Sequence, residues 1–492
     1  MIQEKRSNIY IIGAGFAGRE IALEISSKGI LGHVVAFVDD NPEKIGTEID
    51  NIPVLGPITS LPSLLKEIPA DEALIAIPGA TASQMRRIYT VLRQTDLKRI
   101  RILPRLSQII DGDAHLIQTR EITAEDILGR DQVAISLRES LDYLRGKRVL
   151  ITGAGGSIGS ELARQLLSGG AERLYLFDHG ENNLYEIEKE LRLLQEEGVG
   201  EKATIIPIIG EMQDPSYMEF ILKRLKADAI FHCAAYKHVP LLEENPVEAI
   251  KNNVFGTRNV LSAARKSGVP RFVFVSTDKA VDPVSVYGIS KAIAEELVLS
   301  SNGDTGDYMV VRFGNVLGSR GSIVPLFTKQ ILKGGPVTVT HPEANRFFMT
   351  IPEAASLVLK AGGVGRRGEV YILDMGDPIS IKDLAEQMVR FYGFAPAEEI
   401  KVVYTGLRPG EKLTESLWRE GECLDSTDHR GINRLKNRIA VENNIDSLIE
   451  KLAPICFFDP EKPKVYRSRL HLREVLHSCF PTIQRPKDEP EY

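Results

Sequence analysis

Cysteine, basic blocks and long apolar runs are scarce in this sequence, and each scarcity excludes a class of protein. The 492 residues include four cysteines, at positions 233, 423, 456 and 479, and no two are spaced as a zinc-binding or redox pair would be. No apolar run reaches the roughly eighteen residues of a membrane-spanning helix. The net charge is −6, and without a long basic stretch we expect no nucleic-acid partner. We therefore predict a cytoplasmic globular protein with no metal site and no disulfides.

The sequence contains two glycine-rich turns, and these indicate how the chain is organised. The segments NIYIIGAGFAGREIALEI (8–25) and RVLITGAGGSIGSELARQL (148–166) each have the pattern of a strand, a turn and a helix. After the second turn, apolar runs alternate with helical stretches, which is typical of a doubly wound parallel sheet. The predicted fold class is therefore α/β, with two Rossmann-like units, the second doubly wound and followed by a small C-terminal substrate-binding region.

The chain is too long for one typical domain, and the same patterns suggest boundaries. An N-terminal Rossmann-like domain is predicted at 1–125 and a polar linker at 126–145. The catalytic domain is predicted at 146–460, with the substrate-binding region towards its end, where the alternation of strands and helices loosens. Residues 461–492 are expected to form a C-terminal extension and a frayed tail.

The first glycine-rich turn runs from Gly13 to Gly18 and fits the GxGxxG pattern, with Asp39 or Asp40 as the acid that would bind a ribose. Nothing downstream in that domain resembles a cluster of catalytic residues. We therefore predict a structural or regulatory role for this domain, and its ligand is either a nucleotide or nothing.

The second turn carries Gly153, Gly156 and Gly159, and its glycines would let the backbone approach a pyrophosphate closely. The helix that follows would offer free N–H groups and the positive end of its dipole. Asp178 closes the next predicted strand, where a carboxylate binds ribose hydroxyls and repels a 2′-phosphate. No arginine follows at once, so NAD is favoured over NADP.

The segment VFVSTDKAVDPVSVYGISK (273–291) places reactive side chains after a buried strand. If the following segment is a helix, Tyr287 and Lys291 share a face, and the ammonium would lower the pKa of the phenol. Tyr287 could then exchange a proton with a substrate hydroxyl, to which Thr277 would hydrogen-bond. A Tyr and a Lys at this spacing are common on surface helices, but here they follow the fifth strand of a dinucleotide-binding sheet.

Six motifs extend this picture well beyond the local segment. They are TGAGGSIGSEL, HCAAYKHVPLLEENPVEAIKNNVFGT, VSTDKAV, VRFGNVLGSRGSIVPLF, NRFFMTIPEA and GLRPGEKLTE. With them, residues 147–420 resemble the extended short-chain dehydrogenases/reductases, and within these the nucleotide-sugar 4,6-dehydratases of the polysaccharide-biosynthesis family, which act on UDP-N-acetylglucosamine. AFVDDNPEKIG and EDILGR look like the extra domain of the family's long members. Those often carry transmembrane helices before it, so this chain is expected to be a soluble form.

The resemblance implies a lyase that oxidises C4 of the sugar, eliminates water across C5 and C6, and returns the hydride to C6. It makes Lys279 the base that removes the C5 proton and Asp278 the acid that protonates the leaving hydroxyl. These roles require a lowered pKa at Lys279 and a raised pKa at Asp278. The plain alternative is that the two form a structural salt bridge. Many long members have Met at the position of Tyr287, so retention or inversion at C5 stays open.

The resemblance also supplies binding residues. With the turn, it implies an NAD site of Gly153, Gly156, Ser157, Ile158, Gly159, Asp178, Glu211, Met212, Ala234, Ala235, Tyr287 and Lys291. The implied UDP-sugar site comprises Lys237, His238, Asn253, Asn315, Arg346, Arg408 and Glu411. Lys237 has a plain alternative as a solvated surface charge, and Glu211 departs from the Asp that is usual at its position.

Two other functions stay open from the sequence. A nucleotide-sugar 4-epimerase would need Thr277, Tyr287 and Lys291, but would need neither Asp278 nor Lys279. An NAD-binding regulatory or scaffold protein of glycan assembly would need no turnover at all. The superfamily usually associates through helices near the active site, so a homo-oligomer is expected.

Overall fold

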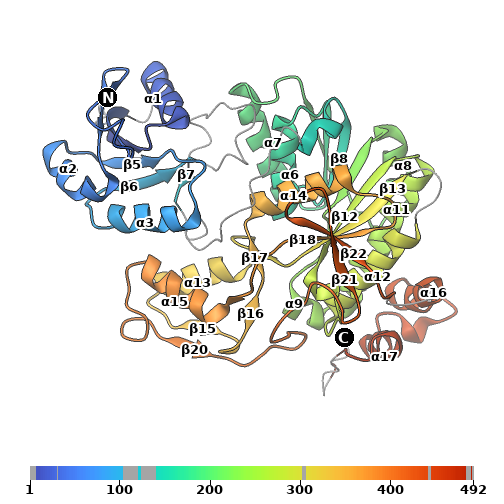
Figure 1. Cartoon of the computed structure of the whole chain (residues 1–492). Helices are drawn as coiled ribbons and strands as arrows, with labels where there is room; N and C mark the ends of the chain where they lie inside the picture. Colours follow the sequence, from blue (N-terminus) through green and yellow to red (C-terminus); the bar gives the residue numbers. More distant parts are fainter. Residues whose placement is uncertain are drawn as a thin grey trace, which may run out of the picture. The chain divides into compact units, whose positions relative to one another are not determined.

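The computed structural model describes residues 7–29, 32–103, 120–122, 140–301, 306–440, 445–483 and 489. Most of the predicted linker at 126–145 and part of the predicted tail lie outside these residues. The chain divides into two compact units, Met1–Arg138 and Glu139–Tyr492 (Figure 1). Within the described residues, no helix is long and apolar enough to span a membrane.

The first unit is a sheet with helices on both faces. The strands lie in the order β3-β4-β2-β1-β5-β6-β7, and those from β4 to β6 are parallel. The elements are β1 (Ser7–Ile12), α1 (Phe16–Lys28), β2 (Gly32–Val38), β3 (Glu48–Ile49), β4 (Ile52–Leu55), α2 (Leu61–Glu67), β5 (Glu72–Ile75), α3 (Ala82–Leu92), β6 (Arg99–Ile102) and β7 (Arg120–Glu121).

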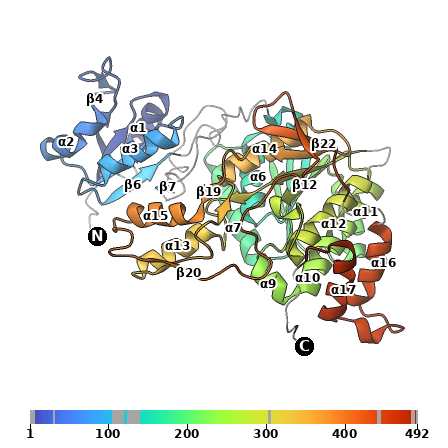
Figure 2. The same ribbon diagram turned by 60° about the horizontal axis from the view of Figure 1, so that its bottom comes forward.

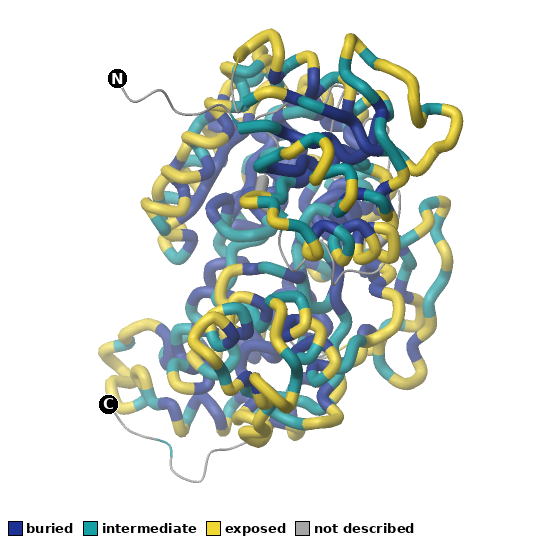
Figure 3. The backbone as a smooth tube through the Cα atoms, turned by 90° about the vertical axis from the view of Figure 1, so that its left-hand side faces the viewer, coloured by how far each residue is buried: buried dark blue, intermediate teal, exposed yellow. Residues whose placement is uncertain are grey.

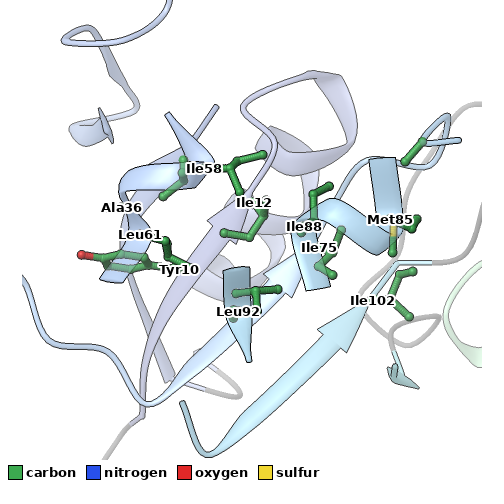
Figure 4. Packing of buried hydrophobic residues seen from close by; sticks show 13 residues of the cluster. Tyr10, Ile12, Ala36, Ile58, Leu61, Ile75, Met85, Ile88, Leu92 and Ile102 are labelled. Atoms are coloured by element: carbon green, nitrogen blue, oxygen red, sulfur yellow. The ribbon is translucent and has the colours of Figure 1, made fainter. Parts of the chain in front are cut away.

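Alternation along β1 gives this unit two cores, because successive strand residues point to opposite faces. Ile9 and Ile11 pack with Ile21 and Ile25 of α1 on one face. On the other face, Tyr10 and its cluster pack with residues of α2 and α3, as Figure 4 shows. The buried strands therefore read as continuous apolar runs, which is how a parallel sheet covered on both faces is expected to read.

The second unit contains a sheet of nine strands in the order β10-β9-β8-β11-β12-β13-β18-β22-β21. Its strands are β8 (Arg148–Thr152), β9 (Arg173–Asp178), β10 (Thr204–Ile209), β11 (Ala229–His232), β12 (Arg271–Thr277), β13 (Asp307–Phe313), β18 (Val370–Leu373), β21 (Cys423–Ser426) and β22 (Ile432–Lys436). All pairs from β10 to β18 are parallel, and β22 and β21 add an antiparallel edge. The predicted doubly wound sheet is confirmed.

The strand order reverses between β8 and β11, and such a switch point opens a crevice beyond the carboxyl ends of the strands. The helices include α6 (Ser157–Ser168), α7 (Glu181–Glu196), α8 (Pro215–Leu225), α11 (Thr257–Lys266), α12 (Val286–Ser300) and α14 (Ile351–Val364). α6 packs with α7 and α14, and α11 packs with α8 and α12 (Figures 1 and 2). Figure 3 shows stretches of buried residues in the interior and exposed residues along the outer turns of the chain.

A smaller region carries three short strand pairs. They are β14 (Asn315–Val316) with β17 (Phe348–Met349), β15 (Val337–Val339) with β20 (Val402–Tyr404), and β16 (Asn345–Arg346) with β19 (Ile379–Ser380). α13 (Ile323–Leu332) and α15 (Ile381–Phe391) pack on each other and on β15. Separately, α16 (Ile445–Cys456) and α17 (Arg469–Cys479) pack against α10 (Pro246–Ile250), which follows α9 (Val239–Glu244) (Figure 2).

Candidate active site

The second glycine-rich turn joins β8 to α6 by backbone packing that leaves no room for side chains. Gly153 has φ +68°, and a Cβ there would lie 2.7 Å from the amide nitrogen of Ala234. A Cβ on Gly159 would lie 2.1 Å from the carbonyl oxygen of Gly153. The start of α6 is therefore held against the end of β8, and its free N–H groups face the crevice. This arrangement fits the pyrophosphate of a dinucleotide.

Asp178 ends β9 with its carboxylate fixed beside the turn. It accepts hydrogen bonds from the amides of Gly155, at 2.9 Å, and Gly180, at 2.8 Å. Among the described residues, its ion-pair neighbour is His179, at 3.6 Å, and no Lys or Arg pairs with it. The position fits a group that binds adenosine ribose hydroxyls. The residues present therefore fit NAD.

One cavity of about 820 Å³ extends from this turn to the small C-terminal region. Sixteen of the residues predicted from the sequence line it: Gly153, Gly156, Ser157, Ile158, Gly159, Ala235, Lys237, His238, Thr277, Lys279, Tyr287, Lys291, Asn315, Arg346, Arg408 and Glu411. Residues from the glycine turn and from the ends of β12 and β13 thus meet in one space.

Six predicted residues do not line the cavity: Asp178, Glu211, Met212, Ala234, Asn253 and Asp278. Asp278 is fully buried. Asn253 is also buried, and its amide bonds the backbone of Tyr236 and the hydroxyl of Ser290 on α12 at 2.8–3.0 Å. Asn253 therefore supports the helix of the active site, and it does not face the cavity.

Tyr287 and Lys291 share a buried face of α12, as the spacing predicted. The hydroxyl of Thr277 hydrogen-bonds to the Tyr287 phenol, but burial raises the pKa of Tyr287 to about 12 despite this bond and the charge of Lys279. Lys291 donates to the carbonyl oxygen of Val275 at 2.8 Å, and burial lowers its pKa to about 7. The predicted lowering of the phenol pKa is wrong for this arrangement, because burial outweighs the nearby cation.

Asp278 and Lys279 form a close pair at the end of β12. Lys279 Nζ lies 2.9 Å from Asp278 Oδ1 and donates to Asn315 Oδ1 at 2.9 Å. Asp278 Oδ1 also accepts from Thr277 Oγ1 at 2.9 Å, whereas Asp278 Oδ2 is buried and finds no donor among the described residues.

The predicted lowering of the Lys279 pKa is wrong for this paired state. Burial alone would lower that pKa, but the carboxylates of Asp278 and Glu415 outweigh burial and raise it. Asn315, predicted near the sugar, is the hydrogen-bond partner that holds the ammonium of Lys279 in place. Asp278 and Lys279 therefore form an ion pair in this structure, which agrees with the salt bridge considered as the alternative from the sequence.

Two residues of this site escaped the sequence prediction. Glu415 lines the cavity, its Oε2 is buried without a hydrogen bond from the described residues, and burial raises its pKa. Arg320 reaches across the glycine turn, where its guanidinium donates to the carbonyl of Gly155 at 3.2 Å and its amide to Ser157 Oγ at 3.2 Å. Glu415 belongs to the motif GLRPGEKLTE and Arg320 to VRFGNVLGSRGSIVPLF. No spacing within these motifs marked either of them as a site residue.

The proposed nucleotide contacts already have partners within the chain. Arg346 donates to the carbonyl oxygens of Asn345, Lys412 and Leu413 at 2.7–2.9 Å, so it holds the loop around residue 412. Arg408 pairs with Glu411, with 2.9 Å between Nε and Oε1. Burial lowers the pKa of Lys237, which lines the cavity. All three cations line the cavity.

The fold combines a glycine turn after β8 with an acid at the end of β9, a Thr at the end of β12, and a Tyr and a Lys on α12. This combination is that of an extended short-chain dehydrogenase/reductase. A family model described as polysaccharide biosynthesis protein matches residues 149–437, and the chain belongs to this family. The predicted family is confirmed. A second model, described as a CoA binding domain, matches residues 4–87 of the first unit.

Known proteins agree with this assignment. The chain is 38% identical over 453 residues to the capsular polysaccharide biosynthesis protein CapD of Staphylococcus aureus, covering 91% of this chain and 74% of the relative. It is 32% identical over 302 residues to the UDP-glucose 4-epimerase of Rickettsia akari, covering 59% of this chain and 82% of the relative. The X-ray structure of Pen from Bacillus thuringiensis is 34% identical, with a TM-score of 0.53, and covers 60% of this chain and 88% of that one.

Proposed function

We propose that the protein catalyses the NAD-dependent 4,6-dehydration of UDP-N-acetylglucosamine to a UDP-4-keto-6-deoxy-N-acetylhexosamine for polysaccharide or glycan synthesis. One observation carries the proposal: the fully buried Asp278 and the cavity-lining Lys279 form a close pair beside the Thr, Tyr and Lys that suffice for hydride transfer. Burying the Asp278 carboxylate costs desolvation free energy, and an exchange of hydride alone makes no use of this carboxylate or of Lys279. Elimination of water needs one acid and one base at this place.

The reaction starts at O4 of the sugar. Tyr287 takes the O4 proton while the Thr277 hydroxyl orients the oxygen, and the nearby charge that favours the phenolate is that of Lys279. Bound NAD, held by the glycine turn and Asp178, would accept the hydride from C4 and return it to C6. Oxidation at C4 acidifies the C5 proton, which Lys279 removes while Asp278 protonates the leaving C6 hydroxyl.

The ion pair and the reactive acid–base pair differ by the position of one proton. Transfer from Lys279 Nζ to Asp278 Oδ1, which are 2.9 Å apart, turns an ammonium and a carboxylate into an amine and a carboxylic acid. Exclusion of water by a bound sugar favours this neutral form, because desolvation penalises both charges. The elimination then regenerates the ion pair, and Lys279 returns its proton to C5.

The protons balance only if Tyr287 and Asp278 exchange one. The proton count of the released water is that of the C6 hydroxyl plus the proton that left O4, since Lys279 gives C5 one proton for the one it removed, and the ammonium protons of Lys279 can exchange with solvent. Tyr287 therefore ends each turnover with a proton that Asp278 has lost. The Thr277 hydroxyl bonds to the phenol and donates to Asp278 Oδ1 at 2.9 Å, so it can pass the proton from Tyr287 to Asp278 and restore both groups.

The product formed in deuterated water tests the proposal. We expect NMR to show a 4-keto-6-deoxy sugar with deuterium at C5 and no net formation of NADH. A product that keeps its C6 oxygen would exclude dehydration.

The second candidate is a nucleotide-sugar 4-epimerase, favoured by the similarity to the Rickettsia akari UDP-glucose 4-epimerase. Epimerisation needs Thr277, Tyr287 and Lys291 only. The double variant Asp278→Asn and Lys279→Ala would leave epimerisation largely intact and would abolish dehydration. Measuring both products from the same variant therefore separates the two functions.

A further inference from the structure

Glu243, near the end of α9, holds the start of the helix that carries Tyr287. Its Oε1 accepts a hydrogen bond of 2.7 Å from the backbone amide of Val286, the first residue of α12. The first amides of a helix have no partner inside the helix, so a buried carboxylate there fixes where the helix begins. Tyr287 is the next residue, and its phenol position depends on that first turn.

Arg473 of α17 holds the other side of the same carboxylate. It donates to Glu243 Oε2 at 3.0 Å and to the Glu243 carbonyl oxygen at 2.9 Å. Arg473 is 2% exposed, and its Nε also bonds to the carboxylate of Glu489. Thr482 adds a hydrogen bond of 2.7 Å to the carbonyl oxygen of Pro283, just before α12.

The substrate loop rests on the same group. A Cβ on Gly410 would lie 3.1 Å from Glu243 Oε1 and 2.9 Å from the Cβ of Ser285, so the backbone of this loop packs directly on the Glu243 carboxylate. Arg408 and Glu411, on either side, line the cavity. Glu243 thus joins three parts: the start of the catalytic helix, the loop proposed to bind the nucleotide, and the C-terminal helix.

We propose that Arg473 and Glu243 form a positioning pair through which α17 sets the placement of Tyr287. Packing alone would not need two charges in this place, because apolar residues of similar size stabilise a buried site at least as well as an ion pair. Instead, hydrogen bonds connect Arg473 on α17 through Glu243 to the backbone amide of Val286, the residue before Tyr287. α17 lies beyond residue 437, where the match to the family model ends.

Replacing Arg473 tests the pair in the full-length chain, with Arg473→Met, Arg473→Lys and Arg467→Met compared with the wild type. Arg467 forms a half-exposed ion pair with Glu248 on the same side of the molecule, so Arg467→Met is the matched control. Amide hydrogen exchange of residues 283–290 is measured with NAD present, together with kcat, KM and their pH profiles. The role of Tyr287 in this inference rests on the proposed function, but the exchange measurement does not.

For Arg473→Met we expect faster exchange at 283–290 and a fall in kcat of about tenfold to a hundredfold, since misplacement by about 1 Å has such an effect. KM for the UDP-sugar should rise as well, because the loop of Arg408 and Glu411 packs on the same carboxylate. The limb of the profile that reports ionisation of Tyr287 should move to higher pH, because a displaced phenol loses the stabilisation that Lys279 and Thr277 give its charged form. Arg473→Lys should recover part of each change, and Arg467→Met should show none.

Unchanged exchange and an unchanged pH profile in Arg473→Met would overturn the inference, whatever happens to kcat. If Arg473→Met fails to fold, Arg473→Lys decides by the same two measurements. Wild-type protein that makes no dehydrated product, but whose exchange at 283–290 responds to Arg473, would refute the proposed function and leave the coupling of α17 to α12 standing.

Discussion

At the scale of single residues, the site contains a chain of four hydrogen-bonded side chains. Tyr287, Thr277, Asp278 and Lys279 are linked by hydrogen bonds in that order. Each hydrogen bond joins a possible proton donor to a possible acceptor, so the chain offers a path for a proton. Substituting one of these four side chains should therefore stop one particular step of the reaction. The step that stops identifies the proton that this side chain transfers.

Asp278→Asn should separate oxidation from elimination. The amide cannot protonate the leaving hydroxyl. Lys279 can still act as the base, because loss of the Asp278 charge removes the main influence that raises its pKa against burial, and Tyr287 is unchanged. We expect dehydration to fall by about 10²–10⁴-fold, the usual contribution of a general acid, while UDP-sugar recovered from deuterated water still gains deuterium at C5. Asp282→Asn is the matched control, because Asp282 is exposed and pairs with Arg419. Loss of both deuterium exchange and dehydration would argue against the separate roles.

Thr277→Val should affect later turnovers more than the first. Valine keeps the shape of threonine but has no hydroxyl, so the proton on Tyr287 cannot reach Asp278. We expect rapid-quench experiments to show a burst of product followed by a steady state slower by about 10²-fold, and Thr277→Ser to restore most of the steady rate. Equal slowing of the burst and the steady state would mean that Thr277 only orients the sugar.

At the scale of elements, β8, β11 and α11 are joined behind the active site by one buried histidine. His232 on β11 contacts Thr152 Oγ1 at 2.6 Å and Thr257 Oγ1 at 2.9 Å. It is fully buried, and burial, with the charge of Lys291 adding to it, lowers its pKa from 6.5 to about 3. The ring is therefore neutral in the folded protein over a range in which it is charged in the unfolded chain.

This histidine should make the second unit sensitive to acid. Because the unfolded chain binds the proton first, stability is complete above about pH 6.5 and is lost as the pH falls towards 3, by up to about 4–5 kcal/mol. Urea unfolding between pH 3.5 and 7 should show a slope of about 1.4 kcal/mol per pH unit from this group. His232→Gln should be less stable at pH 7 but should lose this slope, whereas the half-exposed His471→Gln should keep it.

Elements and local motifs were predictable, and contacts between distant elements were not. The glycine turn, β12 and the face of α12 follow from apolar runs and from spacings of a few residues, so Thr277, Tyr287 and Lys291 could be named together. The bond between Lys279 and Asn315 spans 36 positions, and that between Glu243 and Arg473 spans 230. No sequence periodicity connects charged residues that are so far apart in the chain. The predicted pKa shifts of Tyr287 and Lys279 were wrong for the same reason. The burial and the charged partners that determine each pKa arise only when the chain folds.

At the scale of the whole molecule, the two units carry similar turns with different surroundings. Asp39 in the first unit accepts from the amide of Ala14 at 2.8 Å, as Asp178 does from Gly155, but it also pairs with Lys44 at 3.1 Å. A carboxylate neutralised by a lysine is a poorer ligand for ribose hydroxyls than one without a cation. Each unit also has its own core, so the first can keep its fold without a ligand.

We therefore expect one NAD per chain. Equivalent glycine substitutions in the two turns can show which unit binds it. A Cβ on Gly159 would lie 2.1 Å from the carbonyl of Gly153, and a Cβ on Gly18 would lie 2.1 Å from the carbonyl of Gly13. The two changes thus disturb equivalent contacts in the two turns. Isothermal titration should give one site in the wild type, none in Gly159→Ala and one in Gly18→Ala. NAD at about 100 times its Kd should stabilise wild type and Gly18→Ala by about 2.7 kcal/mol, and should not stabilise Gly159→Ala. Two sites in the wild type, falling to one in Gly18→Ala, would instead make the first unit a second dinucleotide site.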